Sequence, residues 1–147
     1  MWKPRSTLFL TAALAVAGPA YSSHLVAQQR EMFNPPGTPT NLPFNNGIKI
    51  GNMMWVAGME GDVTGDIEAE TKSALEKSRS VLQAGGFDLK DVVAVQVYLA
   101  DIKEFQKMNG VYRTFFLDPR PTRTTVQVAA LVNNARVEIT MTAYKAP

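Results

Sequence analysis

The stretch Pro121-Thr-Arg-Thr-Thr-Val-Gln-Val128, with Arg136-Val-Glu-Ile139 shortly after it, decides how this sequence is interpreted. Both stretches alternate apolar with polar side chains, which predicts two strands over about 123–129 and 135–144. They place one arginine, Arg123, and one glutamate, Glu138, on strands of a 147-residue chain that has no cysteine and one histidine. Thiol catalysis, imidazole catalysis and the common zinc sites need cysteine and histidine residues, of which this chain has none and one, respectively. Arg123 and Glu138 are therefore the leading catalytic candidates, and we expect no metal.

Further strands precede these two. Short apolar runs over 48–50 and 53–57 flank the dipeptide Gly51-Asn52, which favours a hairpin turn. A third apolar run over 92–99 alternates well enough to predict another strand.

Two helices are expected between the strands. The first is capped by Asp66, runs to about Ala84 and stops at Gly85-Gly86. Its predicted apolar face is formed by Ile67, Thr71, Ala74, Ser78, Val81 and Leu82. Its charged face, which is predicted to be solvated, is formed by Glu68, Glu70, Lys72, Glu76, Lys77 and Arg79. The second helix is capped by Asp101 and runs through Leu117. It contains Gly110, which suggests close packing or a kink because glycine costs helix stability.

Strand–helix–strand order occurs twice, which predicts an α+β domain whose mixed sheet carries both helices on one face. We expect the helix-covered face to hold the apolar side chains Val93, Val95, Val97, Leu99, Val126, Val128, Val137, Ile139, Met141 and Ala143. The opposite face is expected to hold Gln96, Tyr98, Arg123, Thr125, Gln127, Glu138 and Thr140. Oligomerisation through that mixed face would place Arg123 and Glu138 in clefts between subunits.

The N-terminus has the pattern of a secretory signal. Lys3 and Arg5 precede an apolar core of about ten residues, and small residues offer cleavage after Ala20 or Ala27. The alternative is an uncleaved anchor, but the apolar core is shorter than the roughly 20 residues that span a bilayer. We therefore expect a signal peptide over 1–27, no stable membrane anchor after cleavage, and a periplasmic or secreted mature protein.

Residues 28–43 contain four prolines and a glycine and are expected to form an extended tether, followed by one folded domain over 44–147. Removing residues 1–27 lowers the basic count from 15 to 13, against 13 acidic residues, so the net charge falls from +2 to zero. A chain without excess positive charge is a poor match to a run of phosphates, so nucleic-acid binding is not expected.

Several motifs in order resemble the RidA/YjgF family. They are Gly51-Asn-Met-Met-Trp-Val-Ala-Gly58, Asp91-Val-Val-Ala-Val-Gln-Val-Tyr-Leu-Ala-Asp101, Asn109-Gly-Val-Tyr-Arg-Thr-Phe-Phe116, Pro121–Val128 and Val137-Glu-Ile139, and the likeness covers about 43 to 145. The resemblance implies a chorismate-mutase-like α+β fold and a homotrimer with ligand clefts between subunits. It also implies hydrolytic deamination of 2-imino or enamino acids to 2-keto acids and ammonia, without a cofactor.

The resemblance gives the site residues their expected roles. Arg123 would hold the substrate carboxylate with its two-pronged guanidinium, and Glu138 would handle the attacking water. Thr125 and Asn109 would help to orient the substrate. Phe44 lies where active members often carry a tyrosine, so that part of the substrate-binding surface lacks a phenolic hydroxyl.

Other departures from the family pattern keep alternatives open. Ala57 replaces a common serine, Thr125 a common cysteine, Val132 a proline and Thr140 a second glutamate. These losses leave open a non-catalytic trimer that binds a small carboxylate or acts as a scaffold. Ribonuclease or translation-inhibitor activity, credited to some relatives, is disfavoured by the zero net charge and because the only histidine, His24, lies in the predicted signal peptide.

Overall fold

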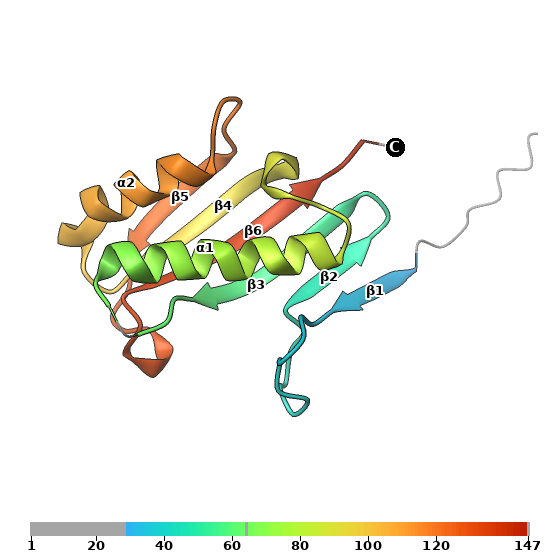
Figure 1. The fold of residues 1–147 in the computed structure, drawn as a ribbon, viewed down its shortest axis with the longest axis horizontal. Helices are drawn as coiled ribbons and strands as arrows, with labels where there is room; N and C mark the ends of the chain where they lie inside the picture. The colour runs from blue at the N-terminus through green and yellow to red at the C-terminus, as the bar shows by residue number, and fades with distance from the viewer. Residues whose placement is uncertain (1–28, 64, 147) are drawn as a thin grey trace, which may run out of the picture.

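The protein, described by a computed structural model over residues 29–63 and 65–146, is a six-stranded mixed sheet with two helices on one face (Figure 1). The strand order is β1-β2-β3-β6-β4-β5, and only β4 and β5 run parallel. The strands are β1 (Arg30–Phe33), β2 (Gly47–Ile50), β3 (Met53–Glu60), β4 (Val92–Leu99), β5 (Thr122–Gln127) and β6 (Val137–Tyr144). The helices are α1 (Ile67–Ala84) and α2 (Phe105–Phe115), which lie side by side over the sheet. This confirms the predicted α+β class and the placement of both helices on one face.

Helix α1 follows the sequence prediction closely. The Asp66 side chain accepts a hydrogen bond from the Ala69 backbone N–H at 2.9 Å, and Gly86 takes a positive φ of 82° just after the helix end. The six residues predicted to face the sheet are all buried, which anchors the helix on the core.

Helix α2 begins later than expected. Asp101 caps a single 3-10 turn over Ile102–Glu104, where its side chain accepts from the Lys103 N–H at 2.9 Å, and α2 follows directly. Gly110 is exposed, and a Cβ built on it meets no atom within 4 Å. The close packing expected at this glycine is therefore wrong.

Glu70 was expected on the solvated face of α1 and is instead fully buried. Its carboxylate accepts a hydrogen bond from the Arg136 backbone N–H at 2.8 Å and pairs with the Arg136 guanidinium at 3.2 Å. Arg136 also pairs with Glu104 at 2.9 Å. Glu70 can be buried because the start of β6 supplies the partners that a buried carboxylate needs. The contacts fix the start of β6, two residues before Glu138.

Strand β4 departs from simple alternation at its start. The β4–β6 register shifts between Val92 and Ala94, so Val92 points into the core and Val93 is exposed. The expectation that Val93 shares the core face of Val95 is wrong for this reason, because an extra residue in a strand reverses the alternation around it.

The proline-rich segment is more ordered than predicted. Residues 30–33 form β1, which pairs antiparallel with β2 and is joined to it by a Lys49–Glu31 ion pair of 3.1 Å. The following loop is held by hydrogen bonds from Asn34 to Asn45 at 3.0 Å and from Asn46 to Thr38 at 3.1 Å. The segment expected to be an extended tether thus contains a strand at residues 30–33, whose backbone is satisfied by pairing with β2.

The predicted signal peptide over residues 1–27 and its cleavage sites lie outside the described residues. Within the described residues, neither helix has the length and apolar character needed to cross a membrane.

Candidate functional site

Arg123 lies on β5, an edge strand of the sheet, and its guanidinium rests on two aromatic rings of α2. Its Cζ is 4.4 Å from the ring centroid of Tyr112 and 5.6 Å from that of Phe105. Such a cation–π arrangement positions a guanidinium while leaving its N–H groups free to bind an anion. Within residues 29–63 and 65–146, Arg123 forms no ion pair.

Two hydroxyl groups on the same side of the sheet lack partners. Tyr112 is 5% exposed, and its hydroxyl is buried without a hydrogen-bond partner in the described part of the chain. The Thr125 Oγ1 atom is also buried without a hydrogen-bond partner in the described part of the chain. Burial raises the pKa of Tyr112 to about 12, although the Arg123 charge opposes this shift, so the phenol stays protonated at neutral pH. Arg123 and these two hydroxyl groups together offer several N–H and O–H donors to one polar ligand.

Asn109 lies on the α2 face that carries Phe105 and Tyr112, one helical turn from each. It is 8% exposed and one of the few buried polar side chains. Asn109 and Arg123 are thus both neighbours of Tyr112, Asn109 along α2 and Arg123 from β5.

Arg123 and Thr125 do not lie on the face of the sheet that was predicted for them. Arg123 is in register with Val95, and Thr125 with Val97, and both valines are buried under the helices. Neighbours in register point to the same side of a sheet, so Arg123 and Thr125 lie on the helix-covered face. Val126, expected in the core, is 42% exposed on the opposite face. The polar side chains of β5 predicted the open face for these residues. That prediction is wrong because α2 covers this edge of the sheet by placing the rings of Phe105 and Tyr112 against Arg123.

Glu138 belongs to a second group of residues on the open face. It lies on β6 between the buried residues Val137 and Ile139, and its side chain lines an open hollow of about 700 Å³. The hollow is also lined by Phe44, Ala57, Gly58, Met59, Glu60, Lys77, Val132, Asn133 and two residues of the ordered N-terminal loop, Pro39 and Leu42. Phe44, 51% exposed, thus lines the same hollow as Glu138.

The backbone around Glu138 explains its position. A Cβ on Gly58 of β3 would overlap the Glu138 Oε1 atom, so the missing side chain lets this carboxyl group lie against the neighbouring strand. The β3–β6 register shifts between Val56 and Met59, which places Gly58 at an irregularity of the ladder. Burial, and secondly the nearby charge of Glu60, raise the pKa of Glu138.

The two groups do not meet within one chain. Arg123, Thr125 and Asn109 lie on the helix side, whereas Glu138 and Phe44 line the hollow of the open face, with β4 between the two strands concerned. A small substrate cannot touch Arg123 and Glu138 of the same chain in this arrangement.

Sequence reasoning missed two residues of the site. The sequence predicted no site role for Tyr112, which appears only within the motif Asn109–Phe116, and none for Glu60. The spacing of Phe105, Asn109 and Tyr112 was a signal for the first, because it puts a polar side chain between two rings on one face. Nothing local in the sequence marks Glu60, since its position opposite Glu138 depends on the strand register.

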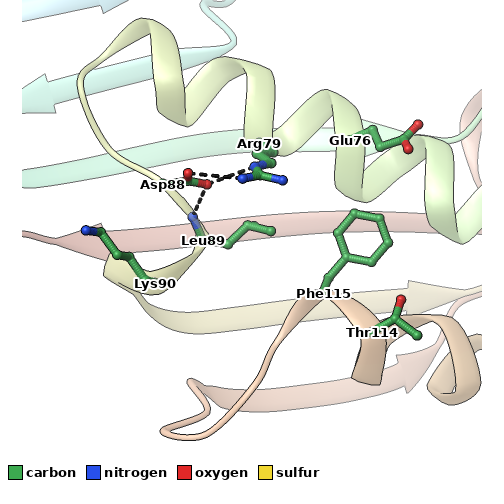
Figure 2. A pocket seen from close by; sticks show the side chains of 7 residues that line it. All are labelled: Glu76, Arg79, Asp88, Leu89, Lys90, Thr114 and Phe115. Carbon is green, nitrogen blue, oxygen red and sulfur yellow. Dashed lines mark hydrogen bonds and ion pairs between the residues drawn. The ribbon is translucent and has the colours of Figure 1, made fainter.

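A different hollow, between the C-terminal part of α1 and the end of α2, contains none of the predicted site residues (Figure 2). Its main charged groups pair with one another: Arg79 contacts Asp88 through two bonds of 2.9 and 3.2 Å. The guanidinium holds the pKa of Asp88 below its usual range. Within the described residues, no cluster of three histidine, cysteine, aspartate or glutamate side chains is placed to hold a metal ion.

Comparison with known proteins gives the family. A family model described as Endoribonuclease L-PSP matches residues 37–145. A RutC family protein of Pyrococcus horikoshii is 38% identical over 110 residues, which cover 70% of this chain and 87% of the relative. The 2-iminobutanoate/2-iminopropanoate deaminase of Homo sapiens is 32% identical over 112 residues, covering 71% of this chain and 82% of the relative.

Solved structures share the fold. A member of the YjgF/YER057c/UK114 family from Mycobacterium tuberculosis superposes with a TM-score of 0.74 at 31% identity, covering 80% of this chain and 100% of that one. E. coli TdcF with bound serine gives a TM-score of 0.71 at 26% identity, covering 79% of this chain and 99% of that one. The shared fold and the range matched by the family model, residues 37–145, define an α+β protein with the fold of these relatives. The chain belongs to the RidA/YjgF family, and relatives named as imine deaminases support a RidA-type function.

Proposed function

We propose that this protein hydrolyses reactive 2-imino or enamino acids to 2-keto acids and ammonia. The observation that carries the proposal is Arg123, an arginine without an ion pair in the described chain, held on the rings of Tyr112 and Phe105 beside two partnerless hydroxyls. Such a site suits a small carboxylate, because a guanidinium offers two parallel N–H donors to its two oxygens. TdcF, a structural relative, is described with serine bound, and serine carries a carboxylate.

The reaction follows from the two groups of side chains. Arg123 would bind the carboxylate, with Thr125 and Asn109 orienting the substrate beside it. Water adds to the carbon of the C=N bond while a carboxyl group, Glu138, removes a proton from it, and the electrons of the C=N bond pass to nitrogen. Protonation of that nitrogen lets ammonia leave, and the carbonyl forms. No step requires an organic cofactor or a metal.

Because the two groups lie on opposite faces of one sheet, we propose that the site is assembled from two copies of the chain in a homotrimer. The open face carries exposed apolar side chains, including Trp55 and Val126, which contact between copies would cover. Phe44 and Glu138 of one copy would then face Arg123 of another across each cleft.

The proposal is tested by adding the purified protein to 2-imino acids made by an amino-acid oxidase and measuring ammonia release. Wild-type protein should accelerate release, Arg123→Ala should abolish the acceleration, and Arg123→Lys should lose at least about tenfold in kcat/KM because it cannot form the two-pronged contact. Lys90→Ala, in the separate hollow between α1 and α2 that contains none of the predicted site residues, serves as a folded control of altered surface. A wild-type rate equal to the spontaneous rate for several amino acids would instead favour a non-catalytic protein that binds small carboxylates.

We further propose that the protein acts after export to the periplasm or outside the cell, with residues 1–27 removed. The basis is the short apolar core behind Lys3 and Arg5. The mass of the protein recovered from the cell envelope or the medium would show whether the chain has been cut after Ala20 or Ala27.

A further inference from the structure

Glu60 stands directly opposite Glu138 in the sheet. The antiparallel register of β3 and β6 pairs these two residues, so their side chains project from the same face. Both line the hollow that contains Phe44. The Glu138 carboxyl group lies against Gly58, on the strand that carries Glu60.

The surroundings of Glu60 leave one of its oxygens available. Its Oε2 accepts a hydrogen bond from the Asn133 side-chain amide at 2.9 Å. Its Oε1 is buried and has no partner within the described residues. Like charges directly opposite on a sheet repel each other, and two carboxylates that cannot both be solvated tend to retain a proton between them.

The charged groups packed around the pair do not neutralise it. From α1, the Lys77 ammonium donates to the Glu60 backbone carbonyl at 3.1 Å and pairs with the Asp62 carboxylate at 2.8 Å, so its charge is matched by Asp62. From the 3-10 turn over Val132–Asn134, the facing group is the uncharged amide of Asn133. In the proposed assembly, Arg123 of a second copy would face the pair, where the substrate carboxylate would balance its charge.

We propose that Glu60 and Glu138 form a carboxyl pair that holds one proton between them and moves protons in both steps of imine hydrolysis. This inference rests on the proposed deaminase function. It adds Glu60 to the residues that act on the substrate, and it assigns a source to the proton that the departing nitrogen needs.

The proton balance closes at each step. As the water oxygen bonds to the C=N carbon, the carboxylate of the pair takes a proton from water and the carboxylic acid gives its proton to nitrogen. The product is a neutral carbinolamine, and the pair still holds one proton. In the second step the carboxylate takes the hydroxyl proton, the acid protonates nitrogen, the C–N bond breaks, and ammonia and the keto acid leave. The pair ends as it began.

The first test is independent of catalysis. Carbon-13 NMR of side-chain carboxyl groups in the full-length mature protein follows the titration of Glu138, assigned by its loss in Glu138→Gln. In Glu60→Gln, Glu138 should titrate at lower pH than in the wild type, because the neighbouring negative charge is gone. The matched control is Glu76→Gln, which removes an exposed carboxylate of α1 that does not line the hollow of Glu138 and should leave this titration unchanged. An unchanged Glu138 titration in Glu60→Gln overturns the pair, whatever the activity of the protein.

The second test uses the rate of ammonia release as a function of pH. The wild-type rate should fall at high pH as the pair loses its shared proton. In Glu60→Gln this fall should begin at lower pH, with kcat at pH 7.5 reduced roughly tenfold or more and KM little changed. Glu76→Gln should keep the wild-type profile. If Glu60→Gln keeps the wild-type profile, the proton role is overturned. If the wild type itself releases no ammonia, the proposed function fails separately, and the NMR titration still decides whether the pair exists.

Discussion

At the scale of single residues, Glu138 links stability to pH. Its pKa is raised in the folded protein, first by burial and then by the Glu60 charge, so the fold favours its neutral form. The stability that it contributes is therefore complete below its unfolded pKa, near 4.5, and is lost as pH rises through the folded pKa.

Glu138→Gln should consequently be more stable than the wild type at pH 7, because the amide stays neutral. The two proteins should converge below pH 4.5, where Glu138 is protonated in both states. Urea unfolding at a fixed protein concentration, without substrate, measures the difference at each pH. A variant less stable than the wild type at pH 7 would contradict the raised pKa.

At the scale of secondary-structure elements, α2 contains a glycine that its packing does not require. A Cβ on Gly110 meets nothing within 4 Å, and the position is exposed in the described chain. Gly110→Ala should raise the free energy of unfolding by up to about 1 kcal/mol, because alanine has the higher helix propensity.

Gly61→Ala is the matched control for this change. A Cβ there would lie 2.5 Å from the Glu70 Cα atom, in the backbone of α1, so the same substitution should lower the midpoint of thermal unfolding. If Gly110→Ala and Gly61→Ala changed the stability of the protein equally, the packing around each glycine would not determine the effect of the substitution.

At the scale of the whole molecule, the proposed site needs two chains because its two groups lie on opposite faces of the sheet. Arg123→Ala and Glu138→Ala should each be inactive as homo-oligomers. After denaturation and refolding together at equal amounts, about one quarter of the clefts should contain an intact Arg123 and an intact Glu138, if subunits mix at random. Ammonia release from the mixture should therefore recover to roughly a quarter of the wild-type rate. A mixture as inactive as either variant would place both residues in one chain's site.

The sequence was sufficient where local rules dominate. Asp66 caps α1 and the helix ends at Ala84 with the predicted face buried, because capping and a 3.6-residue period depend on neighbours along the chain. The candidates for the site were also identified from sequence, as residue types in family motifs, and Phe44 does lie with Glu138.

The predictions failed where a residue's surroundings come from distant segments. Glu70 has the spacing of a surface residue, yet Arg136, 66 positions away, makes its burial possible. Val93 follows the alternation of β4 but is turned outward by the register shift against β6. Residues 30–33 lack a strong strand pattern of their own and are ordered by pairing with β2.

The sequence by itself therefore determined the α+β class, the ends of α1 and the identity of Arg123 and Glu138 as candidates. Only the tertiary structure decided which face of the sheet each of them occupies, that Tyr112 supports Arg123, and that Glu60 stands opposite Glu138. The physical reason is that residue type and periodicity act over a few positions of the chain. Strand register and helix coverage depend instead on how distant segments pair and pack, and they set the charge, burial and partners of each side chain.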